Sequence, residues 1–305
     1  MPIILAISGG PDSTFLLHLL LSLTPQPPII LAHVNYHLRG HDSQLDQKFV
    51  ENLAKSHQLK LEILSVKAAK LSGNLEVNCR KLRYEFFEKL RQKYLASLIL
   101  TGHNRSDQTE TFLFNLIRGA NYRGLSAMTE LDQNRFLYRP LLSIPKSEIL
   151  HFLKTHKIAF RLDKSNLDLK FSRNFLRHKI LPLLEKLNPN FQETLSSTIE
   201  NYQENQQIID QITNSWLQKN YQNQQFDLQT FLNESRALQR KIIDQLYQQI
   251  HQKSLPSKHT REILKVLRQN QANLQKPFGP KTTIKISREG NSKLRKVMIK
   301  SNSEK

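Results

Sequence analysis

The chain has 305 residues, of which 38% are hydrophobic, so it can bury the core of one large domain and a smaller one. It carries 45 Lys and Arg against 26 Asp and Glu, a formal net charge of +19, which indicates a polyanionic partner. Nucleic acid suits this charge better than a membrane, because no apolar run approaches the ~20 residues of a spanning helix. Residues 251–305 hold 14 basic and 3 acidic side chains, although a solvated basic tail is the alternative interpretation of that segment.

A single cysteine, Cys79, excludes an intrachain disulfide framework and a paired-cysteine metal or sulfur-carrying site within this chain. This composition suits a reducing compartment. An apolar run begins at Ile3 and leaves no room for a leader peptide before it. We therefore expect a cytoplasmic protein, or a protein of the plastid stroma if its gene lies in the organelle. The oligomeric state is left open, with a homodimer as one option.

The first chemically distinctive stretch is the sequence Ser-Gly-Gly-Pro-Asp-Ser at residues 8–13. The apolar run before it lacks a period-two alternation, which is typical of a parallel strand buried on both faces, and a leucine-rich segment follows it. Glycines allow a ligand to approach the backbone, and the unpaired N–H groups of a helix N-terminus favour an anion. The pattern predicts a strand, a phosphate-binding loop and a helix, with a simple glycine-rich turn as the alternative. The predicted nucleotide-binding residues of this loop are Ser8, Gly9, Gly10, Pro11, Asp12 and Ser13.

Asp12 is the unusual member of this loop. A carboxylate repels bound phosphates unless a divalent cation lies between them, so Asp12 is predicted to bind Mg²⁺ or to position the nucleotide. No Gly-Lys-Ser/Thr sequence follows the loop, which excludes a Walker-type site.

Strands and helices then alternate along the first half of the chain, as expected for a doubly wound α/β fold. Further strands are predicted at residues 29–35, 60–66, 97–101 and 136–142, which makes a parallel sheet of five. The helices between and after them are predicted at residues 43–57, 74–94, 106–118 and 145–156. Ser43 with Asp46 and, separately, Ser106 are the expected helix caps.

Three polar segments follow predicted strands, at residues 8–13, 33–39 and 103–110. Ligands of open parallel sheets bind beyond the carboxyl ends of the strands, so these segments should meet in one crevice. Asp107 and Glu110 share the first turn of a helix and could bind an ammonium group there. Stabilisation of the helix N-terminus by the two carboxylates is the alternative interpretation.

Two pairs of arginines lie at helical spacing. Arg80 and Arg83 share a face of the helix at residues 74–94, where an exposed salt-bridged face is the alternative to a binding role. Arg173 and Arg177 lie one turn apart on a predicted helix, where they could clamp a phosphate or simply be solvated.

The texture of the sequence changes after residue 190. Residues 201–225 include 13 Asn or Gln, which suggests a long connecting helix ending in a polar loop. Apolar residues at helical spacing then predict a small helical domain, followed by a basic hairpin near the end of the chain. We therefore predict a catalytic domain over residues 1–185 and a connecting segment over residues 186–225. A small, mostly helical, basic domain that binds nucleic acid is predicted over residues 226–305.

The loop motif Ser-Gly-Gly-x-Asp-Ser resembles the pyrophosphate loop, or PP-loop, of the ATP pyrophosphatases, which split ATP into AMP and pyrophosphate. Over residues 1–267 the order and spacing of motifs resemble the tRNA(Ile)-lysidine synthetase family. Asn104 stands where many members have a second histidine, and the longer C-terminal extension of some members is missing. The matching segments are residues 8–13, 33–39, 73–76 with Arg80, Arg83 and Tyr84, 102–103, Asp107-Gln108, Glu110-Thr111, 118–119, 139–142 and Arg173-Asn174 with Arg177.

The resemblance implies a reaction among ATP with Mg²⁺, L-lysine and an isoleucine tRNA with a CAU anticodon. The O2 atom of the first anticodon cytidine attacks the α-phosphate of ATP, and lysine then displaces AMP. It also implies a set of site residues. These are His33 and Asn35 beside the loop for ATP, Asp107 and Glu110 for lysine, His103, Arg83 and Arg80 for the α-phosphate charge, and Arg173 and Arg177 for the substrate.

Two other classes remain open. A tRNA thiolase of the same superfamily would use the same loop, but such enzymes commonly need paired cysteines. A non-catalytic tRNA-binding protein would need the basic surface but not the loop beside two carboxylates. Superfamily members that amidate small metabolites would not need the charge of +19.

Overall fold

The computed structural model describes residues 1–68, 73–162, 169, 172–251, 255, 257–269, 274–278, 282–288 and 295–301. The chain divides into two compact units, Met1–Glu200 and Asn201–Lys305. The three-part functional division expected from the sequence stays a prediction.

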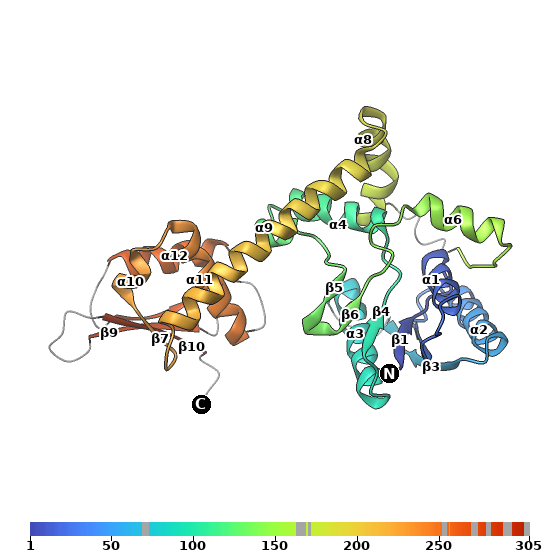
Figure 1. Cartoon of the computed structure of the whole chain (residues 1–305), viewed down its shortest axis with the longest axis horizontal. Helices are drawn as coiled ribbons and strands as arrows, with labels where there is room; N and C mark the ends of the chain where they lie inside the picture. The colour runs from blue at the N-terminus through green and yellow to red at the C-terminus, as the bar shows by residue number, and fades with distance from the viewer. Residues whose placement is uncertain are drawn as a thin grey trace. The chain divides into compact units, whose positions relative to one another are not determined.

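The first unit is built on a six-stranded sheet in the order β3-β2-β1-β4-β6-β5 (Figure 1). All neighbouring strands are parallel except β5, which pairs antiparallel with β6. The strands are β1 (Ile3–Ala6), β2 (Ile29–Asn35), β3 (Lys60–Ser65), β4 (Leu98–Leu100), β5 (Leu131–Asp132) and β6 (Leu137–Tyr138). The predicted α/β class and its five parallel strands are confirmed, but the sheet has a sixth, antiparallel strand that was not predicted. The additional strand, β5, has two residues, too few for a periodic pattern.

Helices cover both faces of this sheet, as the doubly wound prediction requires. Ile3 and Leu5 of β1 pack with α1 (Pro11–Leu21), α2 (His41–Ser56) and α6 (Lys146–Thr155). Ile4 points to the other face and packs with α3 (Leu75–Lys93). This alternation explains why β1 is apolar at every position: each side chain meets a helix layer. The remaining helices of this unit are α4 (Arg105–Ile117), α5 (Tyr122–Leu125), α7 (Ser172–Phe175) and α8 (Leu181–Leu187), with the 3-10 turn η2 (Gln133–Arg135) and the π-helix η4 (Leu176–Ile180).

The predicted helix caps are wrong. Asn104, not Ser106, caps α4: its side chain accepts hydrogen bonds from the Ser106 and Asp107 N–H groups, and Asp107 completes a capping box. Ser43 lies inside α2, and Asp46 forms ion pairs of 2.7 and 2.9 Å with Arg39 and Arg161.

The second unit combines helices with a four-stranded antiparallel sheet in the order β7-β10-β9-β8. The predicted basic hairpin is confirmed as β9 and β10, whereas the expected mostly helical domain contains more strand than predicted. Helical structure was expected from residue 226 onward, but Phe226 lies on a strand, β7. The elements are α9 (Phe191–Asn220), which begins in the first unit, then β7 (Gln225–Asp227), α10 (Leu228–Leu232), α11 (Arg236–His251), α12 (Ser257–Gln269), β8 (Leu274–Phe278), β9 (Thr282–Arg288) and β10 (Arg295–Ser301).

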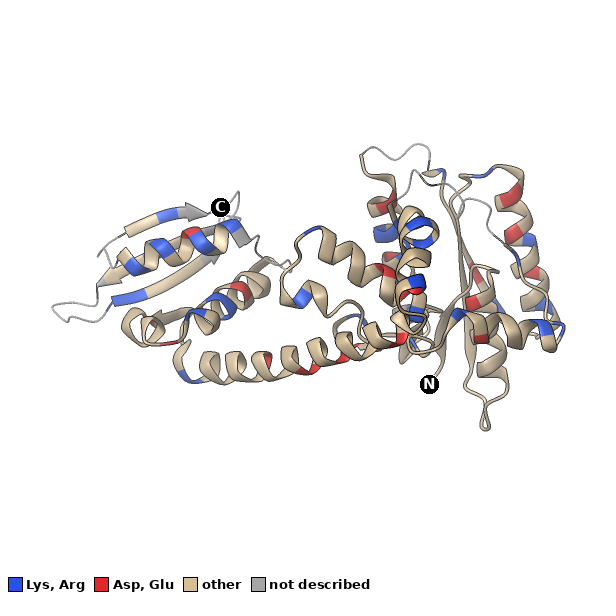
Figure 2. Cartoon of the chain, turned by 90° about the horizontal axis from the view of Figure 1, so that it is seen from above, with Lys and Arg blue, Asp and Glu red and all other residues tan. Residues whose placement is uncertain are grey.

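One apolar core joins the helices and the sheet of this unit. The Trp216 ring packs 5.7 Å from Phe226 and 6.1 Å from Phe231, edge to face. Ile284 of β9 and Ile299 of β10 are 0% and 3% exposed in the same core. Basic side chains occur on both the helices and the strands of this unit (Figure 2).

Candidate active site

The predicted phosphate loop connects β1 to α1 and turns sharply at Gly9. Gly9 has φ +83°, and a Cβ atom there would lie 3.1 Å from the Phe49 ring, so the turn requires glycine. Pro11 opens α1, where its missing N–H costs nothing. Ser13 Oγ accepts a hydrogen bond from the Ser8 N–H at 3.1 Å and donates one to the Gly10 carbonyl at 3.2 Å. These bonds hold the start of α1 in place, with its N-terminus available to an anion.

Gly102, at the end of β4, lets this strand lie against the start of α1. A Cβ atom at Gly102 would be 2.9 Å from the Asp12 carbonyl carbon and 3.0 Å from the Ser13 nitrogen. Both are backbone atoms that cannot rotate away. The carboxyl ends of β1 and β4 therefore meet at the loop, as the sheet topology predicts.

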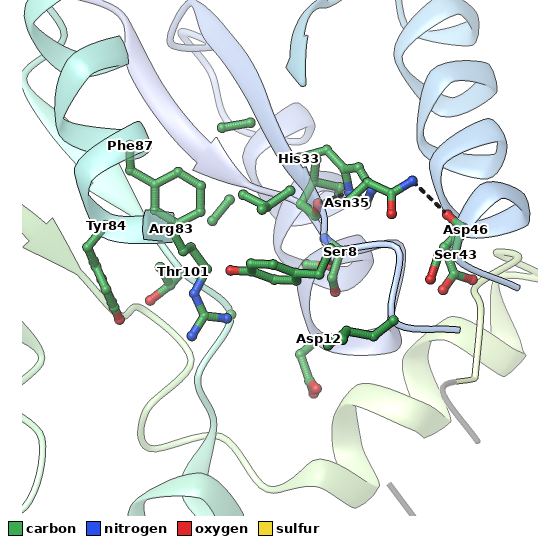
Figure 3. A pocket seen from close by; sticks show the side chains of 18 of the residues that line it. Ser8, Asp12, His33, Asn35, Ser43, Asp46, Arg83, Tyr84, Phe87 and Thr101 are labelled. Atoms are coloured by element: carbon green, nitrogen blue, oxygen red, sulfur yellow. Dashed lines mark hydrogen bonds between the residues drawn. The ribbon is translucent and has the colours of Figure 1, made fainter. Parts of the chain in front are cut away.

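A pocket of about 650 Å³ lies beyond these strand ends (Figure 3). Its walls come from the loop and the ends of β1, β2 and β4, together with α2 and α3. The predicted site residues that line it are Ser8, Asp12, Ser13, His33, Asn35, Arg83 and His103. Among the residues that the structure describes, Asp107, Glu110 and Arg177 form a neighbouring cluster rather than part of these walls.

His33 and Asn35 form the wall on the β2 side. His33 is 4% exposed and its Nδ1 lies 2.9 Å from the Ile7 carbonyl, while burial lowers the pKa of its ring. The Asn35 amide donates to the Ser43 carbonyl at 3.2 Å and accepts the His37 N–H at 2.9 Å. These hydrogen bonds fix the orientation of both side chains in the wall, and their predicted role in ATP binding stays a prediction.

Asp12 points toward Lys146, a residue that sequence reasoning missed. Lys146 Nζ, at the first position of α6, lies 2.6 Å from both Asp12 carboxylate oxygens. The Asn104 amide donates a third hydrogen bond to Asp12 at 2.9 Å, which gives this position a clear role. Asp12 thus has a cationic partner at the edge of the loop.

Asp12 suits Mg²⁺ only as a single protein ligand. Mg²⁺ in nucleotide sites takes one or two carboxylates, with phosphate oxygens and water as the other ligands. Within the described part of the chain there is no group of three or more metal-binding side chains. A metal ion held by Asp12 would therefore need its other ligands from a bound nucleotide and water.

Arg177 binds the two predicted lysine-binding carboxylates. Its Nε and an Nη lie 2.5 and 3.0 Å from the two oxygens of Glu110, a bidentate pair, and that Nη lies 3.4 Å from Asp107. Burial raises the pKa of Glu110, and the Arg177 pair opposes this shift. Asp107 also accepts the Asn104 N–H at 3.0 Å as part of the capping box. The two carboxylates are thus already paired with a guanidinium of the chain itself.

Arg173 and Arg177 have different surroundings, although they are four residues apart. Arg173 lies in α7, with its guanidinium carbon 6.0 Å from the centre of the Phe114 ring. Arg177 lies in the π-helix η4 and reaches Glu110. The charge of Arg173 also acts on Glu110, so both arginines contribute positive charge near this carboxylate.

His103 is held neutral. Burial, and then the charges of nearby arginines, lower the pKa of its imidazole to about 3. Its Nδ1 lies 2.8 Å from the Thr101 hydroxyl. At neutral pH the ring therefore offers a hydrogen bond rather than a positive charge. The arginines that contribute are Arg139, Arg83, Arg80 and Arg173.

The parallel sheet, the glycine loop at its switch point and the pocket beyond the strand ends define a nucleotide-binding α/β protein. A family model described as PP-loop domain matches residues 1–184. The chain belongs to this PP-loop family, which implies ATP as its nucleotide. No helix in the described ranges is both long and apolar enough to span a bilayer.

Curated relatives narrow the comparison. The chain is 39% identical over 204 residues to tRNA(Ile)-lysidine synthase of Porphyromonas gingivalis (65% of this chain, 44% of the relative). It is 38% identical over 221 residues to that of Mycoplasma mycoides (68% and 54%), and 32% identical over 286 residues to that of Bacillus anthracis (88% and 60%). The chain spans about half the length of the curated relatives it matches.

A solved structure supports the fold. The U34-tRNA thiolase NcsA of Methanococcus maripaludis, determined with its 4Fe-4S cluster, superposes with a TM-score of 0.56 at 20% sequence identity. The superposition covers 67% of this chain and 72% of NcsA. At this identity the similarity establishes the shared PP-loop architecture.

Proposed function

We propose that the protein ligates L-lysine to C2 of the first anticodon cytidine of the isoleucine tRNA with a CAU anticodon. ATP is converted to AMP and pyrophosphate in the reaction. The observation that carries this proposal is the carboxylate pair beside the PP-loop pocket, a buried Glu110 and a half-buried Asp107, which pairs with the Arg177 guanidinium. An acidic cluster that binds one organic cation suits lysine, and the named relatives at 32–39% identity support the tRNA substrate.

The first step would take place at the loop. The O2 atom of cytidine attacks the α-phosphate, a new P–O bond forms, and the bond to the pyrophosphate oxygen breaks. Loop N–H groups and Lys146 hold the phosphates, and Arg83 faces the developing charge. Asp12 would hold a Mg²⁺ ion, which would supply neutralising charge for the departing pyrophosphate.

The second step would take place beside α4. The lysine ε-nitrogen attacks C2, the C2–O2 bond breaks, and AMP leaves with the former O2 oxygen. The amine must lose a proton before it attacks. Glu110 is the better base of the two carboxylates, because burial raises its pKa, whereas Asp107 is engaged in capping α4. Arg177 must give way to the lysine ammonium or share the carboxylates with it.

The substrate would place the enzyme where tRNA is matured, in the cytoplasm or in a plastid stroma.

Pyrophosphate release tests the proposal, measured with purified protein, ATP, Mg²⁺, lysine and an isoleucine tRNA transcript. We expect release to require the transcript and product turnover to require lysine. Release that proceeds equally without a tRNA, or turnover with a sulfur donor in place of lysine, would contradict it.

A further inference from the structure

Four arginines gather around one aromatic ring beside the pocket. The guanidinium carbons of Arg80, Arg83 and Arg135 lie 4.9, 5.7 and 6.0 Å from the centre of the Tyr84 ring. Arg139 joins them: burial lowers the pKa of Arg139, and a hydrogen bond with Tyr84 opposes this shift. Arg80, Arg83, Arg135 and Arg139 are called the arginine cluster below.

The inner part of the arginine cluster is buried and incompletely satisfied. Arg139 is 4% exposed, and one Nη donates to the Thr129 carbonyl at 2.6 Å. Its Nε is buried and has no hydrogen-bond partner among the described groups. An unpaired guanidinium N–H in the interior is costly, and it suits a site that an acceptor completes.

The positive charges of the cluster also repel one another. Burial lowers the pKa of Arg80, and the charges of Arg83, Arg173 and Arg135 lower it further. Asp132 offsets part of this repulsion, with an oxygen 3.9 Å from the Arg135 Nε. A guanidinium does not lose its proton in proteins, so a bound anion would relieve the repulsion that remains.

The arginine cluster runs from solvent to the pocket. The Arg135 side chain is 60% exposed, while Arg83 and Tyr84 line the pocket itself. Figure 3 shows Arg83 and Tyr84 on one side of the pocket, across from Asn35, Ser43 and Asp46. The phosphate loop lies between these two sides. A polyanion that follows the cluster inward would therefore arrive at the loop.

We propose that the arginine cluster binds the sugar–phosphate backbone of the tRNA strand next to the nucleotide that enters the pocket. This inference rests on the proposed function and deepens it. A guanidinium that packs its face on the Tyr84 ring keeps its in-plane N–H groups free for a phosphate. Arginines spread from the surface to the interior suit a chain of separate phosphates, whereas the compact triphosphate of ATP matches the loop.

Two variants test this binding site: Arg135→Gln and the double variant Arg80→Gln/Arg135→Gln. Each keeps a hydrogen-bonding side chain while removing positive charge. Lys89→Gln is the matched control, because Lys89 is an exposed cation of α3 outside the cluster. The dissociation constant of the isoleucine tRNA transcript is measured over a series of salt concentrations, and that of ATP is measured separately.

The tRNA association constant falls as salt rises, and each lost contact to a single-stranded phosphate makes the slope of log K against log salt less steep. We expect the slope to become less steep by about 0.7 for Arg135→Gln and by about 1.4 for the double variant. ATP affinity should match the parent in Arg135→Gln, and Lys89→Gln should match the parent throughout. A parent-like slope in the folded double variant overturns the inference, as does a loss confined to ATP affinity. Failure of the proposed function would look different: the slopes would change as expected, but the parent would attach no lysine.

Discussion

Replacing Glu110 by Gln separates lysine recognition from ATP chemistry. Glu110 is 2% exposed and binds Arg177 through both oxygens, so it presents a preorganised, weakly solvated anion to a cation. Glutamine keeps the shape but loses one acceptor and the charge. A charge-assisted hydrogen bond contributes about 1.5–3 kcal/mol, which corresponds to a ten- to roughly 150-fold loss of lysine affinity.

Asp107→Asn should behave differently, because Asp107 also completes the capping box of α4. One of its oxygens accepts the Asn104 N–H, and the other lies 3.4 Å from Arg177, a weaker contact than those of Glu110. We therefore expect a smaller loss of lysine affinity, about tenfold, together with about 1 kcal/mol of lost folding stability. Glu110→Gln should instead show the larger loss of lysine affinity and the smaller loss of folding stability.

Single-turnover kinetics with radiolabelled ATP and tRNA provide the assay. Both variants should form the adenylated tRNA at a rate close to the parent and convert it slowly, so that the intermediate accumulates. High lysine concentration should restore conversion in Asp107→Asn, whereas Glu110→Gln also lacks the proposed base and should convert slowly even at saturating lysine. If both variants instead fail at adenylation while lysine affinity is intact, the carboxylates serve ATP or its metal ion, and the reasoning is refuted.

Three further predictions concern the loop and its surroundings. Lys146→Met removes the cation 2.6 Å from Asp12 and should weaken ATP binding about tenfold, and Lys146→Arg should recover part of the loss. ATP titrations that match the parent would limit Lys146 to a structural role. Gly102→Ala places a Cβ 2.9 Å from the backbone of Asp12 and should cost about 1–3 kcal/mol of stability and much of the ATP affinity. Thermal unfolding and ATP titration measure these two effects, and a variant that matches the parent in both would disprove the close contact. The pKa of His103 is lowered to about 3 from 6.5, so its contribution to stability is fully present above pH 6.5 and is lost as the pH falls toward 3. In urea unfolding, His103→Gln should therefore flatten the dependence of the unfolding free energy on pH between these values. Identical pH dependence in parent and variant would argue against a neutral ring.

Contiguous patterns predicted most of the first unit. The strand expected at residues 29–35 is found with those bounds, because a mostly apolar run between turns has few other interpretations. The phosphate loop was equally visible, since its glycines and serines all act within six residues. Both signals are local, and that is why sequence alone could supply them.

Pairs of residues distant in the chain could not be predicted. Lys146 and Asp12 are 134 positions apart, and Arg177 and Glu110 are 67 apart. Only the folded sheet brings them together, and each lysine or arginine alone looks like an ordinary surface cation. Asp46 shows the same limit: its spacing suggested a helix cap, but its partner Arg161 comes from a distant segment.

The small sheet of the second unit shows how short strands escape a periodic analysis. β7 has three residues, and its pairing with β10 joins segments about 70 positions apart. The predicted basic hairpin also supplies core residues, since Ile284, Ile286, Val297 and Ile299 are at most 3% exposed. Removing it would disrupt the core of the unit, so the role in tRNA binding that the sequence predicts for it is better tested by neutralising exposed lysines such as Lys285.

The central claim is that lysine becomes covalently attached to one defined base of a tRNA. The most direct measurement is mass spectrometry of nuclease fragments from the isoleucine tRNA transcript after incubation with the full chain, ATP, Mg²⁺ and lysine. We predict that the anticodon fragment gains the mass of lysine less one water, and that a transcript with uridine at the first anticodon position stays unchanged. An unmodified anticodon fragment despite complete conversion of ATP to AMP and pyrophosphate would contradict the account.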